Sequence, residues 1–179
     1  MSNLIVREHS SSKYSPRTYY NAKSADLTVA FATDFHTAGE KCTKNAAGDK
    51  YLSLDLNLNE LETARSLYKA MVCTNAKTLN IAGNGIYTLA KSQITQRCID
   101  NYVYFVLAKV IQYLPIHKIY TGGQTGVDLA GARAAWHLGI DCEVTYPKGY
   151  LMRGEDKIDR EHSHEYIVKL IQEYIPYDN

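Results

Sequence analysis

The sequence lacks paired cysteines, a strong net charge and long apolar runs. Its net charge of +1 argues against a general nucleic-acid binder, which needs an excess of basic residues. No apolar run is long enough to span a bilayer, and residues 1–12 lack the apolar core of a signal peptide. The four cysteines form no Cys-x-x-Cys pair, which favours reduced thiols in a cytoplasmic protein; they are Cys42, Cys73, Cys98 and Cys142. We therefore expect a cytoplasmic protein with no membrane or nucleic-acid partner.

The composition favours a folded protein with a substantial core. Hydrophobic residues make up 45% and charged residues 22% of the 179 positions, a balance typical of globular domains. We predict a single domain over residues 1–179, in which residues 1–24 form an irregular N-terminal arm with one short strand at 4–7. Tyrosine is abundant at 15 copies, and its rings either pack in the core and on the surface or stack on the bases of a ligand.

A short strand, a glycine-rich turn and an alanine-rich helix follow one another in the second half of the chain. Residues 118–121 are β-prone, and Gly122, Gly123 and Gly126 come directly after them. Such a turn is a typical anion site, because the loop amides point outward and the helix dipole favours negative charge. The alternative is a tight turn that binds nothing. No Lys-Ser or Lys-Thr pair follows Gly126, which excludes a P-loop, and the third glycine is misplaced for the dinucleotide-binding fingerprint.

Strand and helix patterns alternate along the rest of the chain. Strands are predicted at 26–32, 51–57, 78–82, 118–121 and 141–146, and helices at 59–73, 93–114 and 163–174. This order predicts the α/β class, with a Rossmann-like three-layer sandwich around a mostly parallel sheet. We expect an antiparallel edge contributed by the N-terminal strands. The strict alternation of leucine with polar residues at 51–57 indicates an edge position.

Polar or glycine-rich loops follow several of the predicted strands. Because parallel strands end at one side of a sheet, we expect these loops to form a common rim that binds a ligand. The candidate ligand-binding residues are Asp34, Thr37, Gly83, Asn84, Gly85, Thr121, Gly122, Gly123, Gln124, Thr125, Gly126, Asp128, Lys148 and Arg153.

Several of these residues have a plain structural alternative. Asp34 and Thr37 either face a ligand or belong to a solvated connector. Asp128 either accepts a ribose hydroxyl, or acts as a base, or is a helix-terminus charge stabilised by the dipole. Lys148 and Arg153 form either a phosphate clamp or solvated loop charges.

The sequence identifies neither a catalytic residue nor a metal site. Asp34, Glu40 and Asp128 offer a carboxylate pair for N-glycosidic cleavage, but sequence order does not fix their distances. We therefore assign no catalytic residue. The spacing of the histidines and cysteines matches no tight zinc pattern, and we expect no metal and no cofactor; the residues weighed are His36, Cys42, His162 and His164.

A region of about residues 78–158 resembles the SLOG superfamily of Rossmann-like proteins. The similar segments are 121–128, 130–135, Gly139-Ile140 and Pro147-Lys148-Gly149, followed by Glu155-Asp156. The pattern is most similar to the molybdenum-cofactor-carrier-like branch. The resemblance implies binding of nucleotides or nucleotide-derived ligands through the glycine loop. It also implies a homo-oligomer. The Pro-Gly-Gly-x-Gly-Thr-x-x-Glu motif of the phosphoribohydrolase arm is absent.

These observations lead us to expect a binding protein. It would bind and sequester a phosphate-bearing nucleotide-derived small molecule without turnover. One specific version is a phage sponge for immune signals of the cyclic ADP-ribose type, an anti-defence role consistent with the short chain and the absence of an effector domain. Two alternatives stay open: a nucleotide or nucleotide-sugar N-glycosidase or phosphoribohydrolase, and a carrier of the molybdenum-cofactor pterin.

Overall fold

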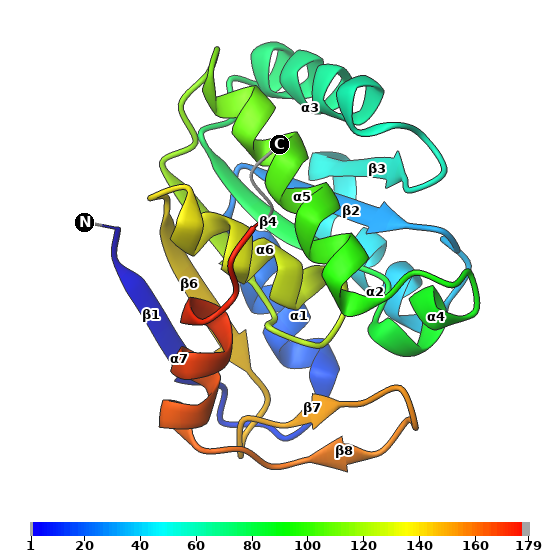
Figure 1. The fold of residues 1–179 in the computed structure, drawn as a ribbon, viewed down its shortest axis with the longest axis vertical. Coiled ribbons are helices and arrows are strands. Elements are labelled where there is room, and N and C mark those ends of the chain that lie inside the picture. The colour runs from blue at the N-terminus through cyan, green and yellow to red at the C-terminus, as the bar shows by residue number, and fades with distance from the viewer. Residues whose placement is uncertain (1, 177–179) are drawn as a thin grey trace.

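The computed structural model describes residues 2–176 as an alternation of strands and helices (Figure 1). The strands are β1 (Leu4–Glu8), β2 (Leu27–Ala32), β3 (Tyr51–Asp55), β4 (Thr78–Gly83), β5 (Lys118–Thr121), β6 (Asp141–Tyr146), β7 (Met152–Arg153) and β8 (Asp159–Arg160). The helices are α1 (Tyr14–Ser24), α2 (Ala38–Ala47), α3 (Glu60–Thr74), α4 (Ile86–Ala90), α5 (Gln96–Ile111), α6 (Val127–His137) and α7 (His164–Gln172), with a 3₁₀ turn, η1 (Gly48–Lys50), before β3. None of these helices combines the length and apolarity of a membrane span.

The six longer strands form one sheet in the order β1-β6-β5-β4-β2-β3, and every neighbouring pair is parallel. The predicted Rossmann-like α/β fold is therefore confirmed, as is the edge position of β3. The antiparallel edge expected from the N-terminal strands is wrong. A helix follows β1 and another follows β2, and each returns the chain to the end where the strand began, which makes the next strand parallel. The antiparallel pair is the small β7–β8 hairpin near the C-terminus.

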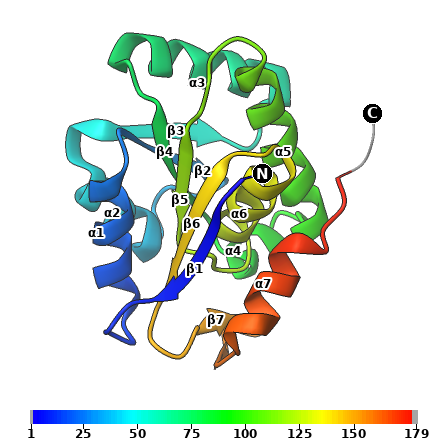
Figure 2. The same ribbon diagram turned by 90° about the vertical axis from the view of Figure 1, so that its left-hand side faces the viewer.

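Helices cover both faces of the sheet (Figure 2). Helices α1 and α2 lie on one face, to the left in that view, and α5, α6 and α7 lie to the right. Helix α6 approaches the sheet closely because alanine and glycine form its inner side. A Cβ on Gly131 would come within 2.6 Å of Cγ2 of Ile81 in β4. The close approach brings the start of α6 to the ends of β4 and β5.

Residues 1–24 are not the irregular arm that was expected. The predicted strand at 4–7 is present as β1, but Tyr14–Ser24 is an eleven-residue helix. Its buried residues are Arg17, Asn21 and Ala22. Because the buried side of α1 is polar, the hydrophobic periodicity that reveals most helices is weak here.

The carboxyl ends of the six strands lie at one end of the sheet, because all the pairs are parallel. From β2 the chain moves outward to β3, and from β4 it moves the other way through β5 to β6. The direction of the strand order therefore reverses between β2 and β4. In open parallel sheets, ligands bind in the crevice beyond such a reversal point.

Candidate functional site

A cavity of about 230 Å³ lies beside this reversal point, at the carboxyl ends of β4 and β5. Helix α1 and helix α2 form one wall, and the start of α4 and the β7–β8 hairpin complete it. The residues that line it are Tyr14, Ser15, Arg17, Thr18, Asn21, Gly39, Cys42, Thr43, Asn80, Ala82, Gly83, Gly85, Ile86, Tyr87, Gly122, Gln124, Thr125, Asp128, Arg153 and Gly154.

Half of the predicted ligand-binding residues line this cavity and half do not. The seven that line it are Gly83, Gly85, Gly122, Gln124, Thr125, Asp128 and Arg153. The remaining candidates are absent from the lining: Asp34, Thr37, Asn84, Thr121, Gly123, Gly126 and Lys148. Seven of the predicted residues thus share one cavity, and several of the other polar groups have structural partners instead of an open face.

Asp128 and Arg17 form an ion pair in the cavity lining. Nη1 of Arg17 is 2.9 Å from Oδ2 of Asp128, and both residues are buried. Burial raises the pKa of Asp128, while the Arg17 charge and the backbone N–H groups of Gln124 and Gly83 act in the opposite direction. Gly122 is required here, because a Cβ at that position would lie 1.2 Å from Nη1 of Arg17.

Two buried polar atoms beside this pair have no hydrogen-bond partner within residues 2–176. They are Nε of Arg17 and Oδ1 of Asn21, and both residues line the cavity. A buried polar atom without a partner costs about 1–3 kcal/mol, so a ligand or water that supplies the partner is stabilised here. Neither residue was predicted, because residues 1–24 were not expected to be helical. Their four-residue spacing, which places them on one helix face, was the available signal.

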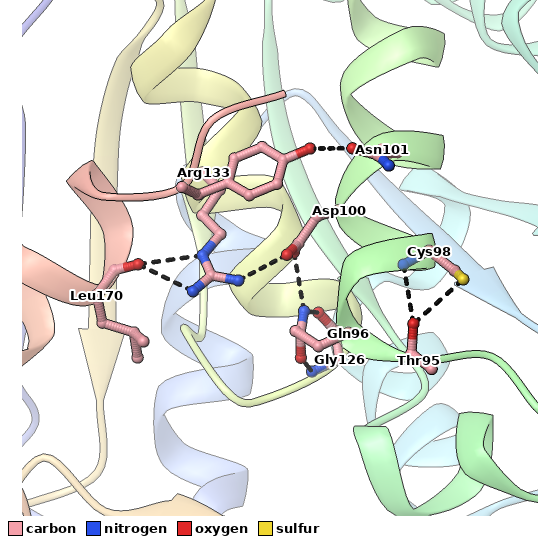
Figure 3. A network of polar contacts seen from close by, with 9 residues as sticks. Thr95, Gln96, Cys98, Asp100, Asn101, Gly126, Arg133 and Leu170 are labelled. Carbon is pink, nitrogen blue, oxygen red and sulfur yellow. Dashed lines mark hydrogen bonds and ion pairs between the residues drawn. The ribbon is translucent and has the colours of Figure 1, made fainter. Parts of the chain in front are cut away.

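The glycine turn does not present a row of open amides. Figure 3 shows Gln96 of α5 against Gly126. The Gly126 N–H donates to Oε1 of Gln96 at 2.6 Å, and Nε2 of Gln96 donates to the Gly126 carbonyl at 2.9 Å. The Val127 N–H donates to the Asn84 carbonyl at 3.2 Å. The prediction of uncovered amides is therefore wrong at Gly126, and the start of α6 is capped by the protein itself.

The side-chain donors of the turn hold the β7–β8 hairpin against the cavity. Nε2 of Gln124 donates to the Leu151 carbonyl at 2.6 Å, and Oε1 of Gln124 accepts from the Arg153 N–H at 3.1 Å. The Thr125 hydroxyl donates to the Arg153 carbonyl. The Thr121 hydroxyl donates to the Asp128 carbonyl at 2.9 Å. These groups shape the site and position its hairpin.

Asn84 connects the two loops at the reversal point. Its Oδ1 accepts from the N–H groups of Thr33 at 2.9 Å and Asp34 at 3.0 Å, and its Nδ2 donates to the Asp34 carbonyl at 2.9 Å. Thr37 caps α2, because its hydroxyl accepts from the Glu40 N–H at 3.2 Å. Lys148 is exposed and does not line the cavity. All four predicted residues named here have structural or solvent-facing positions.

Arg153 lines the cavity, but its guanidinium already grips a carboxylate. Nε and Nη2 of Arg153 lie 2.8 Å and 2.9 Å from the two oxygens of Asp159. The Tyr14 hydroxyl also donates to Asp159 at 2.7 Å. Two guanidinium carbons lie close to the Tyr14 ring, that of Arg153 at 5.2 Å and that of Arg17 at 5.7 Å from its centroid. This side of the cavity opening thus carries an aromatic ring and an arginine whose charge is balanced by Asp159.

Glu40 is a second buried carboxyl close to the cavity. It is 2% exposed, its Oε2 has no partner in the described part of the chain, and its neighbours Gly39 and Thr43 line the cavity. Burial, followed by the charge of Asp128, raises the pKa of Glu40 to about 8. Glu40 is therefore largely protonated at neutral pH, while Arg17 favours the charged form of Asp128.

Comparison with known proteins does not identify a function for this cavity. No protein family matches the chain, and no curated protein matches it. Among residues 2–176, no group of three or more His, Cys, Asp or Glu side chains could hold a metal ion.

Proposed function

We propose that this protein binds a nucleotide-derived, phosphate-bearing small molecule in the cavity beneath α1, without turning it over. The observation that carries the proposal is the pair of partnerless buried atoms, Nε of Arg17 and Oδ1 of Asn21. Buried polar groups in folded proteins nearly always have partners, and exceptions concentrate where a ligand or water completes the set.

The other lining groups suit the nucleoside part of such a molecule. The Asp128 carboxylate can accept hydrogen bonds from ribose hydroxyls, and Tyr14 and Tyr87 add aromatic contact area to the cavity lining. Typical sites for drug-sized ligands measure about 300–1000 Å³. The cavity, at about 230 Å³, is smaller, so we expect it to hold one nucleoside unit while the phosphates lie at the mouth.

Sequestration is favoured over turnover for two reasons. Asp128 is engaged by Nη1 of Arg17 at 2.9 Å, so this carboxylate is poorly placed to take a proton from a water molecule. The SLOG resemblance adds the expectation of signalling nucleotides, and a cyclic ADP-ribose derivative is the specific version of the proposal. The phosphoribohydrolase motif of that superfamily is absent from the sequence.

Calorimetry against the four ribonucleosides, their 5′-mono- and diphosphates and ADP-ribose tests the proposal. We expect at least one phosphate-bearing compound to bind in the micromolar range. Asn21→Ala should weaken that binding about tenfold through the lost hydrogen bond. The matched control Asn45→Ala, at an exposed position of α2, should leave it unchanged. No binding tighter than millimolar across the panel would overturn the proposal.

A second candidate is hydrolysis of an N-glycosidic bond. Its supporting observation is the proximity of two buried carboxyls, Glu40 and Asp128, because the charge of Asp128 helps raise the pKa of Glu40 and paired carboxyls can supply an acid and a base at one site. Chromatography after incubation separates the two functions. Intact ligand recovered after denaturation supports sequestration, and released base supports the hydrolase. A pterin that co-purifies would be visible by absorbance and fluorescence, and would favour the carrier alternative instead.

A further inference from the structure

Among residues 2–176, the cavity lining offers no uncompensated positive charge for a phosphate. Its charged lining residues are Arg17, Asp128 and Arg153. Arg17 is paired with Asp128, and Arg153 with Asp159. A phosphate placed deep inside would therefore meet a neutralised guanidinium and a nearby carboxylate, which is unfavourable.

Uncompensated positive charge is found at the mouth, around Tyr87. Nζ of Lys157 lies 3.9 Å from the centroid of the Tyr87 ring, and Nζ of Lys91 lies 4.7 Å from it. Within residues 2–176, neither lysine forms an ion pair with a carboxylate. Two ammonium groups beside one ring repel each other, and an anion near both relieves that repulsion.

The pKa of the Tyr87 hydroxyl is lowered by the same two lysines. A hydrogen bond to Lys157 and the charges of Lys157 and Lys91 lower the pKa of Tyr87. Tyr87 also lines the cavity, so the two ammonium groups lie beside a wall residue of the nucleoside pocket. The two ammonium groups therefore lie at the opening of a cavity whose interior is polar and neutral.

The position of Lys157 is fixed by the hairpin. Lys157 has a positive φ of 63° in the turn between β7 and β8, and its N–H donates to the Gly154 carbonyl at 3.1 Å. Lys91 comes from the other side of the mouth, directly after α4. The hairpin is docked on the glycine turn through Gln124 and Thr125. The glycine turn therefore acts indirectly, by positioning the hairpin that carries one of the two cations.

We propose that Lys91, Lys157 and the Tyr87 hydroxyl form the phosphate subsite of this protein, outside the cavity that takes the nucleoside. This inference rests on the proposed function and deepens it. The ligand class it names has an uncharged nucleoside part and a phosphate or diphosphate that projects from the pocket toward α4 and the hairpin.

The test compares each ribonucleoside with its 5′-monophosphate and 5′-diphosphate, in native protein and in Lys91→Ala/Lys157→Ala. In native protein we expect the phosphates to bind about tenfold tighter than the nucleoside, a gain that shrinks as salt is added. The double variant should lose that gain and keep the nucleoside affinity. The control Lys23→Ala/Lys69→Ala removes the same charge from exposed positions that do not line the cavity, and should keep the gain.

Failure of this inference differs from failure of the proposed function. If the double variant keeps the full phosphate gain, or native protein shows none, the phosphate subsite is rejected while nucleoside binding stands. If neither nucleosides nor nucleotides bind native protein, both proposals are rejected.

Discussion

Helix α6 carries two buried Asp–Arg pairs that have the same chemistry and different surroundings. Near its start, Asp128 pairs with Arg17 of α1 at 2.9 Å, and further along, Arg133 pairs with Asp100 of α5 at 2.6 Å. Burial raises the pKa of both aspartates, and the paired arginine opposes the shift in both. The two pairs differ in how far their remaining polar atoms are satisfied.

The Arg133 pair is the better satisfied of the two (Figure 3). Nε and Nη2 of Arg133 donate to the Leu170 carbonyl at 3.1 Å and 3.0 Å, and Nε2 of Gln96 donates to Asp100 at 2.9 Å. The same Gln96 side chain holds Gly126. This pair therefore connects α5, α6 and the end of α7. At the Arg17 pair, Nε of Arg17 and Oδ1 of Asn21 have no partner in the part of the chain that the structure describes. The comparison separates a buried network whose polar atoms are completed by the protein from an incomplete one beside a cavity, where the proposed ligand would supply the missing partners.

The largest expected effect comes from breaking the completed pair. Arg133→Leu leaves Asp100 buried without its cation, and we expect a loss of about 3–5 kcal/mol in the free energy of unfolding. Urea unfolding measures it, with Arg65→Leu at an exposed position of α3 as the control. A loss below about 1 kcal/mol would show that the network is not structural.

The same substitution in the incomplete pair should cost less stability and more binding. In Arg17→Leu, Asp128 keeps the N–H groups of Gln124 and Gly83, so we expect a loss of about 1–3 kcal/mol. Ligand affinity should fall by more than tenfold. Equal stability losses in Arg17→Leu and Arg133→Leu, with unchanged binding, would remove the distinction between the two pairs.

The raised pKa of Glu40 predicts that the stability of the cavity region, and so of the protein, depends on pH. The pKa of this carboxyl rises from an ordinary 4.5 to about 8 in the folded protein, so the folded state holds one more proton than the unfolded state between these values. Stability therefore falls as pH rises from about 5 to 8. Glu40→Gln should remove this slope and stabilise the protein at pH 8, on the order of 2 kcal/mol. Thermal unfolding at several pH values measures it, and an unchanged slope in Glu40→Gln would exclude Glu40 as the cause.

Much of the fold was predictable because its signals are local. Alternating leucines identified β3, and the helix at 59–73 was confirmed with Asn59 as its cap, which accepts from the Glu62 N–H at 3.0 Å. The run of strands and helices also predicted the parallel core. Helix α1 was missed because its buried side carries Arg17 and Asn21 in place of apolar residues.

The candidate site was only half predictable, because its decisive contacts are distant in sequence. Gln96 caps Gly126 from 30 positions away, and Arg17 reaches Asp128 across 111 positions. The glycine pattern located the turn correctly but did not show what covers its amides. Lys91 and Lys157 belong to no motif, and they lie beside one ring only because the hairpin is docked on the glycine turn.

A crystal structure with the tightest-binding nucleotide of the panel tests the central claim most directly. We predict density for the nucleoside in the cavity beneath α1, with polar ligand atoms within about 3.2 Å of Nε of Arg17 and Oδ1 of Asn21. A nucleotide bound elsewhere, with these two atoms still unpartnered or bridged only by water, would contradict the account.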